Sequence, residues 1–274
     1  MNFALSTGTL YVYPLRTVLR WARQAAFDTV ELVINPEAIA RGGWAVRRMA
    51  EAEGISIHSV HPTLMRTPGW WERRGGMERT IPFACETRAS TLVMHTPRAE
   101  SLECGEGLVF RQRIERWQPR LAGSGLQLAV ENKAVRSRAD LGYALTPPER
   151  LRAFADRYDL GLVLDTTHAG TAGEDLLRVQ RLFDGRLVNV HLSDMGGWTS
   201  KSPLSRLGSM VGEHRFPGAG DLSLADLLQS LARGGYAGFV TLEVNPFAVR
   251  FWWPRAVRRQ LARALDWMEQ AADG

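Results

Sequence analysis

Short runs of apolar and β-branched residues recur along the whole chain, separated by longer and more polar stretches. Eight such runs are predicted strands: Phe3–Ser6, Thr29–Ile34, Ile55–Val60, Thr91–Met94, Leu126–Val130, Gly161–Leu164, Leu187–Val190 and Phe239–Leu242. Some of them, such as the segment LGLVLD, are apolar almost throughout. A strand that is apolar on both faces is typical of a parallel sheet covered by helices.

The stretches between these runs carry the periodicity of amphipathic helices. Examples are Leu15–Ala26, Trp44–Ala52, Val109–Leu121, Pro148–Tyr158, Leu176–Phe183 and Leu224–Leu231. Strand and helix therefore alternate eight times, and a chain of 274 residues is close to the roughly 250 residues of a typical TIM barrel. We predict an α/β chain with one domain, residues 1–274, folded as a (β/α)8 TIM barrel. A doubly wound open sheet is the alternative, and the even count of eight units favours the barrel.

Polar residues are concentrated where the predicted strands end. We expect all six histidines at or just after a strand's C-terminal end: His58, His61, His95, His168, His191 and, in the long loop after the seventh strand, His214. Four carboxylates occupy matching places, namely Glu131, Asp165, Asp194 and Glu243. Because the C-terminal ends of the strands of a TIM barrel meet on one face, these side chains are expected around a common point.

Imidazole and carboxylate groups together suit divalent metals such as zinc or manganese. A carboxylate at a half-buried strand end is also costly unless a cation or hydrogen bonds compensate its charge. The sequence therefore predicts a metal site at the mouth of the barrel.

Composition narrows the class of protein further. The N-terminus shows no signal-peptide pattern and no run reaches the roughly 18 apolar residues of a membrane span, so we expect a cytoplasmic protein without a membrane partner. The net charge is +5 and the pI about 9.7, but the arginines are spread over predicted helices, which does not favour a nucleic-acid partner. The two cysteines, Cys85 and Cys104, indicate no disulfide framework.

These motifs resemble the xylose isomerase-like TIM barrel superfamily, which includes sugar isomerases and epimerases, inosose dehydratases and type IV apurinic endonucleases (AP endonuclease family 2). The resemblance runs from LSTGTL to LEVNP and includes the segments VEN, LDTTHAG, VHLSD and HRFPGAGDLSLADLL. It implies a metal quartet of Glu131, Asp165, His191 and Glu243. It also implies that Glu131 and Glu243 act as the catalytic base and acid, and that His168 binds substrate or orients a ligand. Gly218 and Gly220 are expected to shape the turn before the last helix.

The resemblance implies two reactions, and we favour the first. In a sugar isomerase or epimerase, one ion of manganese, cobalt, magnesium or zinc, held by the quartet, serves proton transfer beside a chelated carbonyl. In a nuclease, His61, His95 and Glu131 hold one zinc, the quartet a second, and His168 with His214 begin a third. The chain departs from the nuclease at Gly212, where that family has an aspartate ligand that Glu213 would have to replace.

Two further departures lie in the loops that contact DNA in the nuclease. Leu64 stands at a tyrosine position, and the strand-two loop reads NPEAIARGGW without that family's asparagine, glutamine and arginine. A small sugar-like substrate is therefore expected. The sequence leaves open whether the reaction is isomerisation, epimerisation or dehydration, and whether the substrate is phosphorylated.

Several other residues are candidates for binding the substrate. Lys133 and Arg250 are candidate ligands of an anionic group, with a solvated loop lysine the alternative for Lys133. The pairs Trp70–Trp71 and Trp252–Trp253 are expected on the catalytic face, where Trp71 would stack on a sugar ring. A dimer contact is the equal alternative for these tryptophans, and we expect a homo-oligomer.

Overall fold

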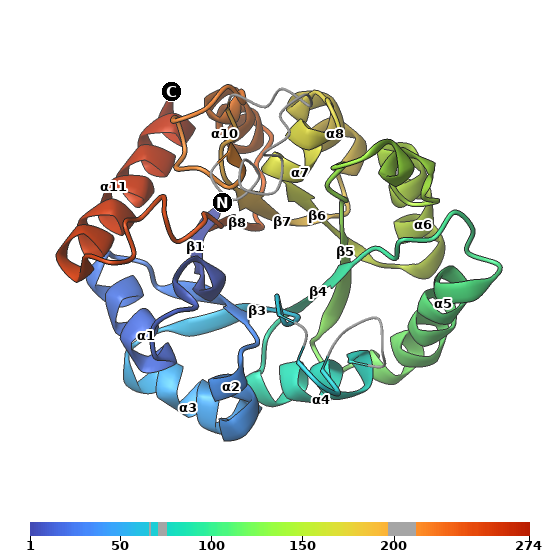
Figure 1. Ribbon diagram of the computed structural model, residues 1–274, viewed down its shortest axis with the longest axis horizontal. Helices are drawn as coiled ribbons and strands as arrows, with labels where there is room; N and C mark the ends of the chain where they lie inside the picture. Colours follow the sequence, from blue (N-terminus) through green and yellow to red (C-terminus); the bar gives the residue numbers. More distant parts are fainter. Residues whose placement is uncertain (66, 71–75, 197–211) are drawn as a thin grey trace.

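The computed structural model describes residues 1–65, 67–70, 76–196 and 212–274 and shows a closed barrel of eight parallel strands (Figure 1). The strands are β1 (Asn2–Ser6), β2 (Thr29–Val33), β3 (Ser56–His61), β4 (Thr91–His95), β5 (Gln127–Glu131), β6 (Gly161–Asp165), β7 (Leu187–Leu192) and β8 (Phe239–Leu242). Strand β8 pairs with β1 from Asn2 opposite Phe239 to Leu5 opposite Leu242, which closes the barrel. The predicted fold is confirmed, and all eight predicted strands are present with ends shifted by at most two residues.

Helices form a ring around the barrel. They are α1 (Leu15–Gln24), α2 (Pro36–Arg41), α3 (Gly43–Ala52), α4 (Met77–Thr87), α5 (Gly105–Trp117), α6 (Pro148–Tyr158), α7 (Thr166–Thr171), α8 (Leu176–Phe183), α10 (Leu224–Arg233) and α11 (Pro254–Asp273), with short 3-10 turns at Thr7–Leu10, Gln118–Leu121 and Arg138–Gly142. Helices α6 and α8 have the predicted bounds. Helix α1 ends two residues earlier than predicted, because Ala26 adopts a left-handed conformation (φ 68°) that a helix cannot continue.

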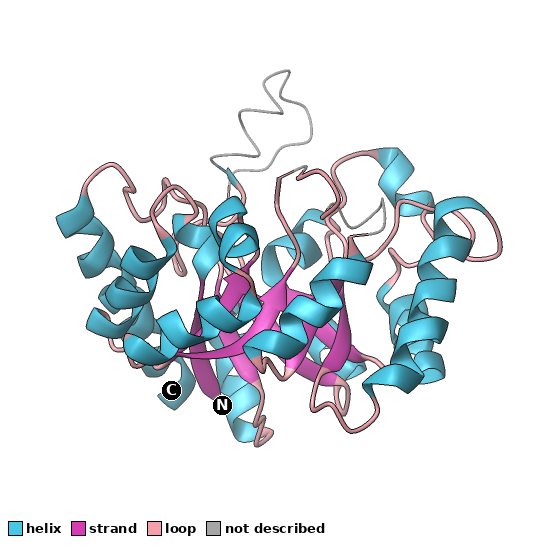
Figure 2. Ribbon diagram, turned by 90° about the horizontal axis from the view of Figure 1, so that it is seen from below, coloured by secondary structure: helices cyan, strands magenta, loops and turns pink. Residues whose placement is uncertain are grey.

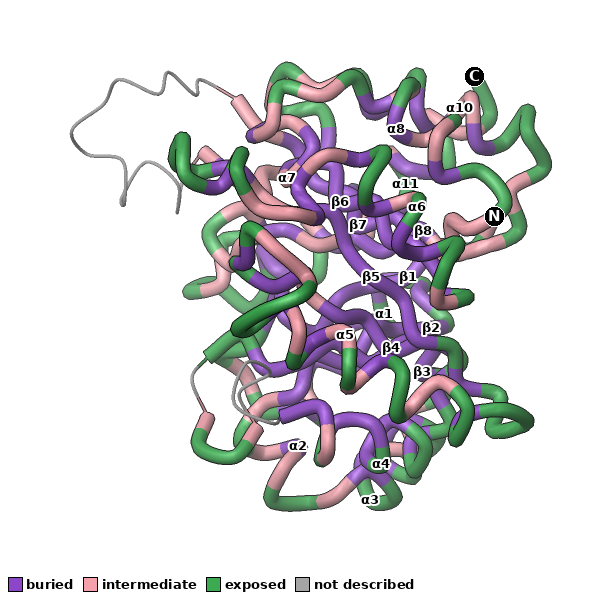
Figure 3. The backbone as a smooth tube through the Cα atoms, turned by 90° about the vertical axis from the view of Figure 1, so that its right-hand side faces the viewer, coloured by how far each residue is buried: buried purple, intermediate pink, exposed green. Residues whose placement is uncertain are grey.

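The two ends of the barrel have different roles. Both chain termini lie at one end (Figure 2), where β1 begins. All strands are parallel, so their C-terminal ends open at the opposite end. Figure 3 shows the buried residues concentrated in the strands and on the inner side of the surrounding helices. The site predicted from the strand ends therefore lies at the mouth facing away from the termini.

The described residues add two further observations. None of the helices among them combines the length and apolar character needed to cross a bilayer. Cys85 and Cys104 are exposed and carry free thiols.

The inside of the barrel is apolar on one side. Val93, Ala129 and Val163 of β4, β5 and β6 pack against one another there. The opposite side is polar and hydrogen-bonded: Ser59 Oγ and Asn189 Nδ2 donate to Glu31 Oε2 at 2.8 and 3.2 Å. Nearly all of these polar side chains are completely buried, so their mutual hydrogen bonds are needed to offset the loss of water.

His58 belongs to this polar side and corrects one expectation. It is the third residue of β3 rather than a residue at the strand's end, so it does not reach the mouth. Its ring stacks on Phe239 with centroids 3.9 Å apart, and its Nε2 lies 3.2 Å from Thr241 Oγ1. Burial lowers the pKa of His58 to about 4, which keeps the ring neutral at ordinary pH.

We predict that His58 makes the fold acid-sensitive. Its pKa is 6.5 in the unfolded chain and about 4 in the folded one, so the unfolded state binds the additional proton between these values. Its contribution therefore falls as pH drops through this window, by about 2 kcal/mol from pH 6.5 to 4.5. Urea unfolding of wild type and His58→Gln at both pH values measures this. The stability difference between the two proteins should shrink by that amount at pH 4.5, and parallel pH profiles would contradict the assignment.

Candidate metal centre at the barrel mouth

Four side chains from four consecutive strands meet at the mouth of the barrel. Glu131 and Asp165 are the last residues of β5 and β6, His191 is the fifth residue of β7, and Glu243 follows β8 directly. Their ligand atoms lie within 4.8 Å of one another, which is the spacing of donors around a single ion. The structure thus brings together the predicted quartet from segments up to 112 residues apart in the chain.

His191 stands at the centre of this quartet. Its Nδ1 lies 2.9 Å from Glu131 Oε1 and 2.8 Å from Glu243 Oε2, so two carboxylates flank one ring nitrogen. Its Nε2 faces the barrel interior and lies 3.0 Å from Glu31 Oε2. A proton held on Nε2 by Glu31 leaves the Nδ1 lone pair to face the centre, which is the arrangement of metal-binding histidines.

Glu31 is the site residue that the sequence analysis missed. It is the third residue of β2 and completely buried, and Ser59 and Asn189 hold the same oxygen that meets His191. The segment TVELV is a plain strand by its apolar pattern. The signal that could have revealed it is the single carboxylate in the middle of a strand that is buried on both faces.

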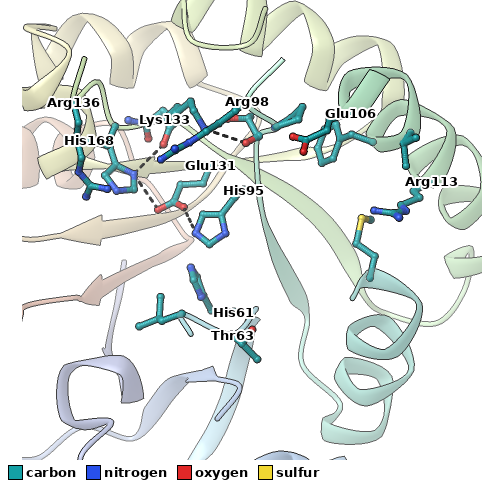
Figure 4. A pocket seen from close by; sticks show the side chains of 18 of the residues that line it. His61, Thr63, His95, Arg98, Glu106, Arg113, Glu131, Lys133, Arg136 and His168 are labelled. Atoms are coloured by element: carbon teal, nitrogen blue, oxygen red, sulfur yellow. Dashed lines mark hydrogen bonds and ion pairs between the residues drawn. The ribbon is translucent and has the colours of Figure 1, made fainter. Parts of the chain in front are cut away.

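Two further groups of ligand atoms surround the quartet. They are His61, His95 and Glu131 on one side and Asp165, His168 and His214 on the other. His61 Nδ1 lies 2.8 Å from the Pro62 carbonyl and His168 Nδ1 3.0 Å from the Asn132 carbonyl. A carbonyl accepts only from a protonated nitrogen, so both rings keep their Nε2 lone pairs for a ligand. Figure 4 shows His61 and His95 pointing toward Glu131 from one side and His168 from the other.

The carboxylates and histidines of the centre strongly shift one another's pKa values. Burial would raise the pKa of Glu131, but His168, His191 and His95 hold it well below its ordinary value. Burial would likewise lower the pKa of His191, but Glu31 and Glu243 raise it well above its ordinary value. For Asp165, burial itself raises the pKa. In the absence of a metal, protonated imidazole therefore balances the carboxylates.

The donor set fits a divalent cation. Among the described residues, Glu131 Oε2 and Asp165 Oδ2 are buried and accept no hydrogen bond. A buried carboxylate oxygen without a donor is costly unless a cation compensates it. Three carboxylates and one imidazole at the quartet suit manganese, cobalt, magnesium or zinc, and the flanking histidines add ligands that zinc prefers.

Glu131 and Glu243 of the quartet line a cavity of about 670 Å³, and the part of the lining that they form is called its floor. Lys133 and His168, both predicted to bind substrate, line this cavity (Figure 4). Trp71 lies outside the described residues. Arg250 is exposed in the turn after β8, with a φ of 54°, and does not line this cavity. Its role in binding stays a prediction.

Asp194 corrects the expectation that it joins the centre. Both of its oxygens accept backbone hydrogen bonds, from Met195 and Leu222 at 2.8 and 3.1 Å and from Gly218 and Gly220 at 3.0 and 2.9 Å. It therefore holds residues 218–222 against the end of β7. Gly220 is required there, because a Cβ would lie 2.3 Å from the Met195 carbonyl.

Glu213, the candidate ligand at the third metal position of the nuclease pattern, has a different partner in this chain. Glu213 is buried and forms an ion pair with Arg136, whose Nη2 lies 2.6 Å from Glu213 Oε2. The carboxylate next to Gly212 is thus bound to a guanidinium and is absent from the group formed by Asp165, His168 and His214. Burial would lower the pKa of Arg136, but Glu213 above all, and then Asp165, raise it, so a permanent cation lies near this group.

The closed barrel, with carboxylates and histidines converging at the C-terminal ends of its strands, defines the class of protein. It is a TIM barrel with candidate metal-binding groups at its mouth. The model of the xylose isomerase-like TIM barrel family matches residues 19–271. The chain belongs to this family.

Three similar proteins illustrate its range. An uncharacterized protein of Mycobacterium tuberculosis is 30% identical over 275 residues, covering 91% of this chain and 92% of the relative. The structure of D-psicose 3-epimerase with D-tagatose from Clostridium cellulolyticum matches with a TM-score of 0.70 and 13% identity, covering 99% of both chains. An AP endonuclease of family 2 from Brucella melitensis matches with a TM-score of 0.69 and 19% identity, covering 98% of both. At such identities, the structural matches show a common fold.

We predict that Glu31→Gln weakens metal binding about 10- to 100-fold, the usual effect of removing a carboxylate that orients a ligating histidine. The amide can offer its NH₂ group to Nε2 and so favour the tautomer that turns a protonated Nδ1 toward the centre. Calorimetric titration with Mn²⁺ measures the affinity, and circular dichroism checks the fold. Glu51→Gln, an exposed change on α3, is the matched control. Equal affinities in both variants would contradict the role of Glu31.

Proposed function

We propose that the protein is a divalent-metal-dependent isomerase or epimerase of a ketose or a related keto-polyol. The observation that carries this proposal is the pair of carboxylates, Glu131 and Glu243, that flank Nδ1 of His191 on the floor of the cavity. Two carboxylates beside one ion are suited to moving a proton on a carbon next to a chelated carbonyl.

The bound metal would supply Lewis acidity that polarises the carbonyl and stabilises negative charge on its oxygen. The protein supplies the proton transfer. The pKa of Glu131 and that of Glu243 both lie below the ordinary value, because nearby histidines overcome the effect of burial. Both groups are thus ionised and able to accept a proton. One removes the proton from the carbon and holds it. The other takes a proton from solvent in the cavity and delivers it to that carbon, and the first then releases its proton to solvent.

His168 would contact substrate above this centre. Its Nδ1 is held by the Asn132 carbonyl, and the same asparagine receives the Asp165 backbone N–H on its side-chain oxygen at 2.7 Å. The ring is thereby fixed relative to Asp165. Its Nε2 can accept a hydrogen bond from a substrate hydroxyl, which would select the orientation of the sugar.

A zinc phosphodiesterase acting on abasic DNA is the second candidate. The group of His61, His95 and Glu131 favours it, because this group would hold an additional ion. The Arg136–Glu213 ion pair argues against a third ion, and Leu64, half exposed at the rim of the cavity, offers no polar contact to DNA. Cytoplasmic location and a homo-oligomeric state stay predictions from the sequence.

The first experiment is incubation of the metal-loaded protein with D-fructose, D-tagatose and D-psicose in D₂O. We predict deuterium at a carbon next to the carbonyl, detected by NMR, together with a second sugar. Glu131→Gln should lose at least 1,000-fold of this activity, because an amide is neither a base nor a good ligand. Glu115→Gln, on the surface of α5, should retain it. Full exchange by Glu131→Gln would refute the assignment of the site.

Metal content separates the two candidates. We predict about one ion per chain by elemental analysis of protein purified without chelator, because the quartet is the group with four protein ligands. This count should not change in the double variant His61→Ala, His95→Ala. Two or three zinc ions that fall in number in this variant would favour the phosphodiesterase, and cleavage of a duplex with an abasic site would then be the deciding assay.

A further inference from the structure

We propose that the substrate carries an oxyanion, a phosphate or a carboxylate, that binds Arg98 and Lys133 on the wall of the cavity. The quartet does not require this group, so an anionic substrate goes beyond the proposed function, on which it rests. The basic side chains that would bind the anion line the cavity away from its floor.

Lys133 is held on this wall. It follows Glu131 by two residues, and its Nζ donates to the Thr96 carbonyl at 3.2 Å. The same ammonium group lies 5.6 Å from the centre of the Tyr143 ring. Both contacts restrict the side chain without neutralising its charge. Part of the entropy that a flexible lysine loses on binding an anion is therefore already lost in the free protein.

Arg98 approaches the same wall from the neighbouring strand. It follows His95, the last residue of β4, by three positions, and is exposed. Burial would raise the pKa of Asp140, but hydrogen bonds from the Arg136 backbone and from Ser137 lower it, and the charge of Arg98 adds to this effect. The guanidinium of Arg98 thus lies near Asp140, which Arg136 contacts only through its backbone N–H. Figure 4 draws Arg98, Lys133 and Arg136 along one side of the pocket, with Glu131 and His95 beneath them.

The lining of the cavity is unbalanced in charge. Outside the candidate metal-binding groups it contains four basic side chains, Arg98, Arg113, Lys133 and Arg136, and one acidic one, Glu106. Arg136 is paired with Glu213, so the other three basic side chains against one acidic side chain leave a net charge of +2. The carboxylates of the floor do not cancel this excess, because a divalent ion and the histidines are their partners. A walled cavity lined by one sign of charge concentrates the opposite sign.

The position of these basic side chains indicates which class of ligand the cavity binds. Arg98 and Lys133 lie on the loops after β4 and β5 and Arg113 lies on α5, whereas the quartet extends across β5 to β8, so the oxyanion would bind to one side of the reacting carbonyl. A cavity of about 670 Å³ is within the usual range for small-molecule sites. Apolar side chains, including Met77, Val109 and Phe110, complete the wall. A sugar phosphate or a sugar acid fits this arrangement better than a nucleic-acid backbone, which needs a continuous basic surface.

The test is calorimetric titration of the metal-loaded protein with D-fructose, D-fructose 6-phosphate and D-fructuronate. We expect at least one charged ligand to bind ten or more times more tightly than D-fructose. Arg98→Gln and Lys133→Met should each reduce this preference about tenfold. Arg16→Gln, an exposed change on α1, is the matched control and should have no effect. The phosphate and the carboxylate ligands distinguish the two sources of the oxyanion.

Three results would overturn the inference: equal affinity for neutral and charged ligands, no binding of either charged ligand, or a preference that survives both substitutions. The last would mean that the anion binds the metal itself. Salt-sensitive binding of an abasic DNA duplex, lost in the same variants, would assign the cations to nucleic acid instead. Turnover of neutral ketoses with no preference for charge refutes only this inference. Binding of a charged ligand without any proton exchange refutes only the proposed reaction.

Discussion

The hydrogen bond between Glu31 and His191 joins the interior of the barrel to its mouth, and the geometry of the centre depends on it. Without an acceptor at Nε2, the imidazole of His191 could carry its proton on either nitrogen. With Glu31 at 3.0 Å, one proton is held on the inner nitrogen. A metal bound at Nδ1 would then replace only the outer proton, between Glu131 and Glu243. The other three candidate ligands lie at strand ends, so the position of the His191 proton decides whether all four could bind one ion.

This arrangement explains why one half of the barrel interior is polar. A buried Glu31 would be expensive alone, and Ser59 and Asn189 lower that cost by donating to the same oxygen. Asn189 in turn accepts from Thr241 at 2.8 Å. The network therefore spans β2, β3, β7 and β8. In the opposite half, from β4 to β6, no buried carboxylate of the described residues needs hydrogen-bond donors at this level. Val93, Ala129 and Val163 pack against one another there as an apolar cluster.

The sequence predicted the barrel because each strand and most helices carry their own periodic signal, and it predicted the quartet because strand ends of a barrel share one face. Its failures have physical reasons. Glu31 and His58 lie within strands, where alternation decides whether a side chain faces the barrel interior, and neither position stands at a strand end. Asp194 has the right position, but its oxygens are used by backbone N–H groups of a loop whose path no local pattern reveals. Partners of this kind become visible only in three dimensions.

The ion pair of Arg136 and Glu213 links the identity of the centre to the choice of substrate. In this chain the buried carboxylate after Gly212 has a guanidinium partner, so its charge is already balanced and it gains little by binding a metal. A permanent cation near Asp165 also repels a further ion from the group containing His168 and His214. Because this pair is balanced, the positive charge that remains on the wall of the cavity belongs to the side chains beside it, Lys133 and Arg98. Pairing Glu213 with Arg136 therefore removes a carboxylate from the candidate metal-binding groups without adding net charge to the wall.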